Sequence, residues 1–100
     1  RSQDMFTANG WNVMQYAVLL AMIAQATGFE AGELVHVIAD CHIYDRHVSV
    51  VEELISRPPF DAPKFHLDES VTDFYAFTPD SVRLEGYQAH PLAQKIPVAV

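Results

Sequence analysis

The feature that most constrains how this chain folds is the uncharged stretch from Met5 to Phe29. Within it, residues 11–27 predict a helix that ends at Gly28, because glycine commonly takes the left-handed conformation that follows a helix. Apolar side chains surround nearly the whole cylinder: Val13, Met14, Ala17, Val18, Leu19, Leu20, Ala21, Met22, Ile23 and Ala24. Such a helix is normally covered on most sides. Since 100 residues offer little material to cover it, we expect the cover to come from a longer chain, a partner subunit or both.

The same helix is not expected to cross a membrane. Polar residues such as Asn12 and Gln15 interrupt it, so its purely apolar run is shorter than the roughly 20 residues of a membrane span. A net charge of -7 argues against nucleic acid and anionic membranes as partners. The length fits one domain at most. The single cysteine excludes an intrachain disulfide, which favours a reducing compartment such as the cytoplasm.

The rest of the chain predicts strands and short helices. Apolar and polar side chains alternate from residue 33 to residue 44, which predicts one long strand. A short helix is predicted at residues 46–56, with Asp45 as its cap and Pro58-Pro59 after its end. Further strands are predicted at residues 64–67 and 82–85, and a helical turn at residues 73–77.

The segment Ala-Asp-Cys-His-Ile-Tyr-Asp-Arg-His, residues 39–47, concentrates groups that could carry chemistry. On a strand, Cys41 and His42 leave opposite faces, so they do not form a nucleophile and its base. Cys41 shares a face with Val37 and Ile43, which predicts a small buried core residue. The polar face offers only Asp40, His42 and Tyr44, and His47 lies beyond the strand end. We therefore expect no metal site.

His42 and Tyr44 stand side by side on the polar face of this predicted strand, near its end. An imidazole and a phenol at this spacing suit the binding of a hydroxyl group of a small ligand. A satisfied polar pair at a strand edge or an interface fits the spacing equally well.

Four blocks in register resemble the thymidylate synthase family, a family of methyltransferases. His42-x-Tyr44 is similar to its deoxyribose-binding strand, and Arg1-Ser2-x-Asp4 to its phosphate-binding motif. Trp11-Asn12 and the helix after it resemble the pyrimidine-recognition segment. The fourth block comprises Glu85-Gly86-Tyr87 and the ending Pro97-Val98-Ala99-Val100, which resemble the C-terminal strand and tail. The resemblance implies an α+β fold with a mixed β-sheet and a long buried helix, of which residues 1–100 would be the C-terminal portion of a single domain.

The resemblance also implies one shared site. The residues implied to bind deoxyuridylate (dUMP) are Arg1, Ser2, Gln3, Asp4, Asn12, His42, Ile43 and Tyr44, and those implied to contact the folate are Asp4, Ala99 and Val100. Arg1 and Ser2 would donate to the phosphate, while the Asn12 amide would read uracil by donating and accepting. His42 and Tyr44 would hold the ribose hydroxyl.

The family reaction converts dUMP to thymidylate (dTMP), with methylene-tetrahydrofolate as donor of the carbon and the hydride. Its nucleophilic cysteine belongs to a Pro-Cys motif expected upstream of Arg1, so the 100-residue chain alone is expected to be inactive. A homodimer is also implied. One departure is Ala8-Asn9-Gly10, which replaces the Gly-x-Pro pattern common before the Trp/Phe-Asn pair.

Two alternatives stay open. A deoxycytidylate hydroxymethylase shares the fold but is expected to carry an acid where this chain has Asn12. A folded interaction module without catalysis would lack the upstream Pro-Cys segment altogether.

Overall fold

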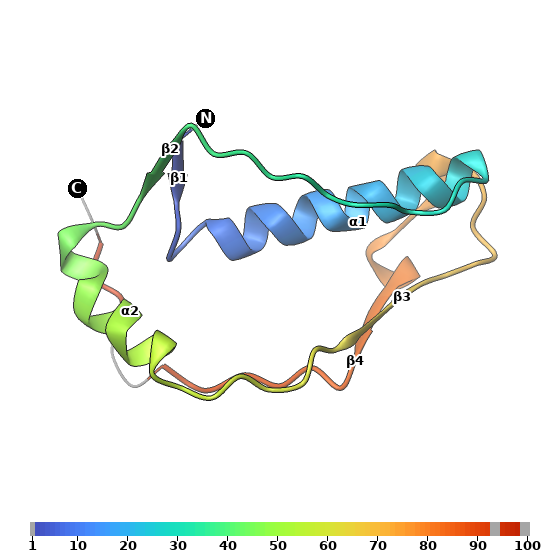
Figure 1. Cartoon of the computed structure of the whole chain (residues 1–100). Helices are drawn as coiled ribbons and strands as arrows, with labels where there is room; N and C mark the ends of the chain where they lie inside the picture. The colour runs from blue at the N-terminus through green and yellow to red at the C-terminus, as the bar shows by residue number, and fades with distance from the viewer. Residues whose placement is uncertain (1, 93–94, 99–100) are drawn as a thin grey trace.

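The computed structural model describes residues 2–92 and 95–98. Within them the chain forms two long-range strand pairs and two α-helices (Figure 1). The elements, in chain order, are β1 (Ser2–Asp4), α1 (Asn9–Thr27), β2 (Asp40–His42), α2 (Val48–Ile55), β3 (Lys64–Leu67) and β4 (Val82–Glu85), with 3₁₀ turns at Asp45–His47, Phe74–Ala76 and Pro79–Ser81.

Helix α1 begins two residues before the predicted start and ends as predicted. Gly28 follows it with φ of 74°, in the left-handed region. The backbone N–H of Phe29 then donates to the Ala24 carbonyl at 2.9 Å, which satisfies one of the last carbonyls of the helix.

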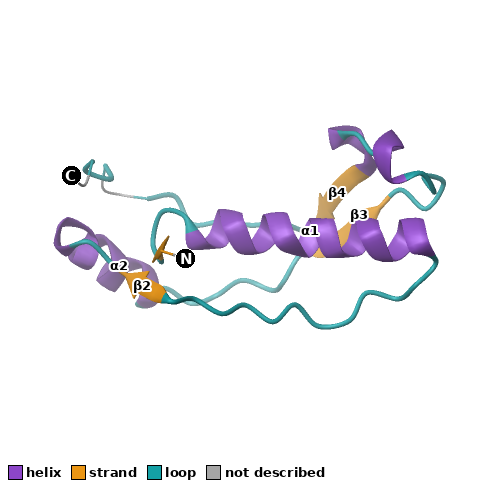
Figure 2. Ribbon diagram, turned by 90° about the horizontal axis from the view of Figure 1, so that it is seen from above, coloured by secondary structure: helices purple, strands orange, loops and turns teal. Residues whose placement is uncertain are grey.

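The predicted strand over residues 33–44 is wrong for most of its length. Only Asp40–His42 pairs, in parallel with β1, with Ser2 opposite Asp40 and Asp4 opposite His42. The chain before Asp40 has no strand partner among the described residues and runs as an irregular segment back along α1 (Figure 2).

The second pair of strands matches the prediction at both ends. β3 and β4 are antiparallel, with Lys64 opposite Glu85 and Leu67 opposite Val82. The 3₁₀ turn Phe74–Ala76 falls in the predicted segment, and the Asp73 side chain caps it by accepting from the Tyr75 N–H. The Gln25 side chain donates to the carbonyls of Asp68 (2.8 Å) and Val71 (2.6 Å), which ties this region to the end of α1.

The predicted helix over residues 46–56 is present, but it has two parts. A 3₁₀ turn at Asp45–His47 leads into α2, whose N-cap is His47 without a side-chain hydrogen bond. The prediction that Asp45 caps this helix is therefore wrong, because Asp45 already lies inside the 3₁₀ turn.

The architecture is α+β and open. Parallel and antiparallel pairing are both present, in two separate two-stranded sheets near opposite parts of α1 (Figures 1 and 2). The radius of gyration is 16.5 Å, whereas a compact domain of this length has about 13 Å. Among the described residues only Ala24 and Val50 are buried apolar residues.

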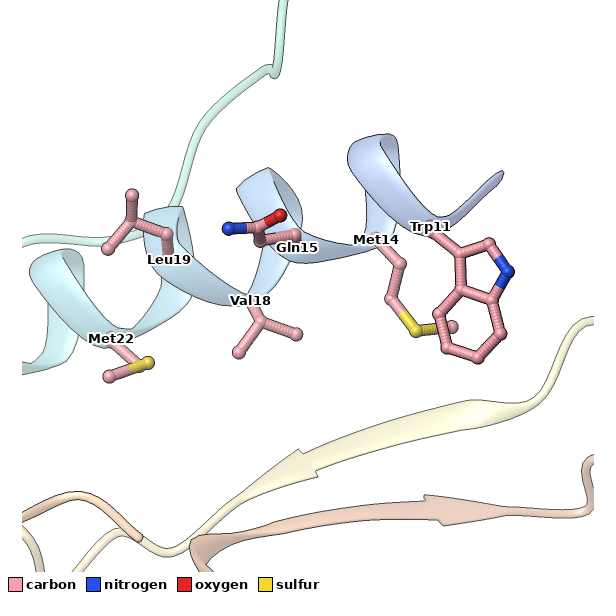
Figure 3. A pocket seen from close by; sticks show the side chains of 6 residues that line it. All are labelled: Trp11, Met14, Gln15, Val18, Leu19 and Met22. Atoms are coloured by element: carbon pink, nitrogen blue, oxygen red, sulfur yellow. The ribbon is translucent and has the colours of Figure 1, made fainter. Parts of the chain in front are cut away.

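The described residues leave α1 largely uncovered, as the sequence predicts. Trp11 is 77% exposed and Met14 is 48% exposed. One side of the helix, which we call the Trp11–Met22 face, lines an open groove and consists of Trp11, Met14, Gln15, Val18, Leu19 and Met22 (Figure 3). In the described part of the chain, no helix has both the length and the apolar character needed to span a membrane.

Candidate functional site

The pairing of β1 with β2 builds the candidate site. It places Ser2, Gln3 and Asp4 directly beside Asp40, Cys41 and His42, although the two segments are far apart in the sequence. The Met5 N–H continues the contact by donating to the His42 carbonyl at 2.9 Å. Two of the sequence-predicted blocks thus lie side by side.

Asn12 joins this pair of strands through Gln3. The chain turns after β1 and enters α1, whose first turn carries Asn12. The Asn12 Nδ2 donates to the Gln3 Oε1 at 3.2 Å. Gln3 is only 8% exposed, so this contact fixes how the Asn12 amide is oriented.

His42 and Tyr44 are in contact after β2. Their ring centroids are 5.2 Å apart and the planes meet at 82°, an edge-to-face arrangement. The His42 Nδ1 also lies 3.5 Å from the Asp40 Oδ1. Tyr44 is 42% exposed and Ile43 between them is 43% exposed, so both remain accessible in this chain.

The Asp4 carboxylate shapes the turn between β1 and α1. Its Oδ1 accepts from the N–H groups of Phe6 (2.9 Å) and Thr7 (3.2 Å), and its Oδ2 accepts from the Thr7 hydroxyl. Partial burial alone would raise the pKa of Asp4, but these hydrogen bonds, and more weakly the nearby His47, outweigh it and bring the pKa below its ordinary value of 3.8. Asp4 therefore carries a negative charge at neutral pH.

The sequence did not point to His47, yet it belongs to the site. The 3₁₀ turn returns His47 to Tyr44: the His47 N–H donates to the Tyr44 carbonyl at 2.8 Å. His47 is 2% exposed, with Phe6 and Tyr44 at its ring edges. Together with Asp4, Thr7 and residues 96–98 it lines a cleft of about 330 Å³. The spacing Tyr44-x-x-His47, one 3₁₀ turn, is the signal that could have indicated this.

Cys41 differs from its prediction. It was expected to be a small buried core residue, but the structure leaves it free and exposed, because no described segment packs on its face of β2. Within residues 2–92 and 95–98, no group of three or more His, Cys, Asp or Glu side chains is arranged to hold a metal ion. The predicted roles of Arg1, Ala99 and Val100 fall outside the described residues.

Known proteins resemble this chain over its whole length. The model of the family described as thymidylate synthase matches residues 1–100. A thymidylate synthase of Bacillus mojavensis is 47% identical over 88 residues, which are 88% of this chain and 32% of that protein. Thymidylate synthase 1 of Bacillus subtilis (strain 168) is 46% identical over the same share of both chains.

A solved structure agrees in fold. Thermostable thymidylate synthase A from Bacillus subtilis superposes with a TM-score of 0.88 at 42% identity, covering 100% of this chain and 35% of that one. The chain thus spans about a third of the length of the relatives that it matches. With a family match over all of its residues, the chain belongs to the thymidylate synthase family.

Proposed function

We propose that this chain is the C-terminal, nucleotide-binding part of a thymidylate synthase that converts dUMP to dTMP. The observation that carries the proposal is the parallel pairing of β1 with β2, which sets Ser2–Asp4 beside Asp40–His42. Family membership supports the reaction class. The full-length enzyme would act as a homodimer in the cytoplasm.

The nucleotide would bind along the edge formed by Ser2, Asn12 and the His42–Tyr44 pair. One Asn12 N–H is directed to Gln3, which leaves the second N–H and the Oδ1 for the base. Uracil offers a matching carbonyl oxygen and ring N–H. His42 and Tyr44 would share the ribose hydroxyl, and Ser2 with Arg1 would bind the phosphate.

The folate would bind in the cleft beside Asp4. Its walls combine a charged carboxylate, the Tyr44 ring and the apolar residues 96–98, so an acceptor and apolar surfaces would face the N–H edge and flat ring of a pterin. Asp4 Oδ2, which already accepts from Thr7, keeps a further lone pair for such an N–H. Ala99 and Val100 would add contacts to the folate.

The chemistry would begin with a thiolate from the preceding part of the enzyme, which adds to the uracil ring and makes the neighbouring carbon nucleophilic. The one-carbon group and the hydride come from methylene-tetrahydrofolate. The residues of this chain would hold the base, ribose and phosphate in the reacting geometry, and Arg1 would stabilise the thiolate by its positive charge.

The direct test is an assay of the purified full-length protein that contains these residues. We expect dTMP to form from dUMP and methylene-tetrahydrofolate. Hydroxymethylation of deoxycytidylate (dCMP) in place of this reaction would identify the hydroxymethylase, and binding of neither nucleotide would overturn the proposal.

Replacing Asn12 with Asp is expected to reverse the preference between the two bases. A carboxylate only accepts, so it mismatches the uracil carbonyl and matches the amino group of cytosine. A mismatch of this kind costs about 1–3 kcal/mol, or roughly 5- to 150-fold in relative dUMP affinity. Calorimetric titration of N12D with dUMP and dCMP measures the reversal. Unchanged preference would show that Asn12 does not read the base.

Replacing Asp4 with Asn is expected to raise the KM for methylene-tetrahydrofolate about ten- to a hundredfold, because a charged acceptor for the pterin is lost. Asn keeps an oxygen for the N–H groups of Phe6 and Thr7, so the turn into α1 should survive. The pKa of Asp4 lies below its ordinary value, so any stability that the carboxylate contributes is fully present above the ordinary pKa and is lost as the pH falls through the lower folded-state pKa.

The Asp4 effect on KM should consequently be constant between about pH 5 and 9. Asp68→Asn is the matched control: Asp68 also forms a turn with a lowered pKa, through the Ser70 side chain and N–H, but it lies away from the cleft. An Asp4→Asn enzyme with the wild-type KM for folate would remove Asp4 from the pterin site.

A further inference from the structure

The C-terminal segment is attached to the nucleotide-binding end of the molecule by two adjacent side chains. His47 Nε2 lies 2.8 Å from the Pro97 carbonyl oxygen, and Arg46 Nη1 donates to the Val98 carbonyl oxygen at 3.0 Å. In Figure 1 the described red segment before the grey end lies in the vicinity of α2, although α2 and this segment are separated by β3 and β4 in the sequence. These two contacts join parts of the chain that share no strand pairing among the described residues.

His47 is built to hold this position. A carbonyl oxygen only accepts, so the His47 Nε2 is the donor. The ring is 2% exposed and is bounded by Phe6 at 5.2 Å and Tyr44 at 5.8 Å between centroids. The Nδ1 is buried without a hydrogen-bond partner among the described residues. A side chain so enclosed has little freedom to rotate. Its side-chain hydrogen bond to the Pro97 carbonyl oxygen therefore holds Pro97 at a fixed position.

Arg46 contributes differently. It lies on the surface, and its guanidinium reaches the next carbonyl along the tail. Two successive carbonyls, those of Pro97 and Val98, are thereby held by two successive residues of the 3₁₀ turn. This arrangement fixes both the position and the direction of the segment at the wall of the cleft that contains Asp4.

We infer that Arg46 and His47 form a clasp that positions residues 97–98 as a wall of the cleft beside Asp4 and Tyr44, with His47 as the main positioning residue. The consequence for folate binding rests on the function proposed above; the clasp itself does not. Because Tyr44 contacts His47 and also belongs to the ribose pair, the clasp links the nucleotide strand to the wall of the cofactor cleft.

The test uses the full-length protein with His47→Leu, His47→Gln and Arg46→Lys. Leu removes the donor, whereas Gln and Lys each keep an N–H donor at the corresponding place. We expect His47→Leu to accelerate trypsin cleavage between Lys95 and Ile96, followed by mass spectrometry, about three- to tenfold. The KM for methylene-tetrahydrofolate should rise by a similar factor while dUMP affinity stays within about twofold. His47→Gln should restore most of both values, and Arg46→Lys should change them little.

His66→Leu is the matched control, since this histidine pairs with Glu85 on the other sheet and does not touch the tail. Unchanged cleavage after Lys95 in His47→Leu, or equal cleavage in the Leu and Gln variants, would overturn the clasp. Faster cleavage with an unchanged folate KM would overturn its role in cofactor binding. A wild-type enzyme without thymidylate synthesis would overturn the proposed function, while the cleavage rates would still decide on the clasp.

Discussion

The 100-residue chain, prepared alone, is expected to form no thymidylate from dUMP and methylene-tetrahydrofolate. The reaction needs a thiolate that attacks the uracil ring, and Cys41 is the only cysteine that this chain offers. Cys41 lies on β2 directly before His42, so its side chain leaves the strand on the face opposite to His42. The formation of dihydrofolate, followed by its absorbance, measures the rate.

The full-length protein with Cys41→Ser supplies the control for this prediction. If Cys41 has no chemical role, this variant should keep its rate within about twofold, as expected for a substitution of a small side chain away from the reaction. Measurable turnover by the 100-residue chain, or loss of most activity in Cys41→Ser, would contradict the assignment of the nucleophile to the preceding part of the enzyme.

Local signals in the sequence account for the elements that were predicted well. The end of α1 was predicted from Gly28 alone, which is a local signal. β3 and β4 are short strands, and each has its pairing partner nearby in the chain. The long strand over residues 33–44 failed because alternation describes which way side chains point but not whether a neighbouring strand exists. β2 begins at Asp40, opposite Ser2, and no described residue pairs with the chain before it.

The same difference between local signals and contacts from distant segments explains which features of the candidate site were predicted. Spacing alone predicted that His42 and Tyr44 lie side by side, since both belong to one short segment. It did not predict the burial state of Cys41, because burial depends on what packs against the strand from elsewhere. Nor did it reveal the Gln3–Asn12 bond or the His47–Pro97 contact, which join segments whose proximity only the folded backbone determines.

Replacing Met14 with Asp is expected to destabilise the full-length protein by at least about 3 kcal/mol, yet leave the helical content of the isolated chain nearly unchanged. In the isolated chain Met14 is 48% exposed, so a carboxylate there stays in water. In the full-length protein we expect the Trp11–Met22 face to be covered, because α1 is apolar nearly all round and relatives are about three times as long. An unpaired charge on a covered face loses its hydration.

Urea unfolding of the full-length protein and circular dichroism of the isolated chain measure the two effects. Met14→Leu is the matched control, since a swap that keeps the volume and the apolar character costs less than about 1.5 kcal/mol even in a packed core. Equal stability of the Asp and Leu variants in the full-length protein would mean that the Trp11–Met22 face remains in water there. The cover of α1 would then have to lie on sides of the helix away from Met14, which also lines the cleft of about 540 Å³ that faces Phe65 and Leu84.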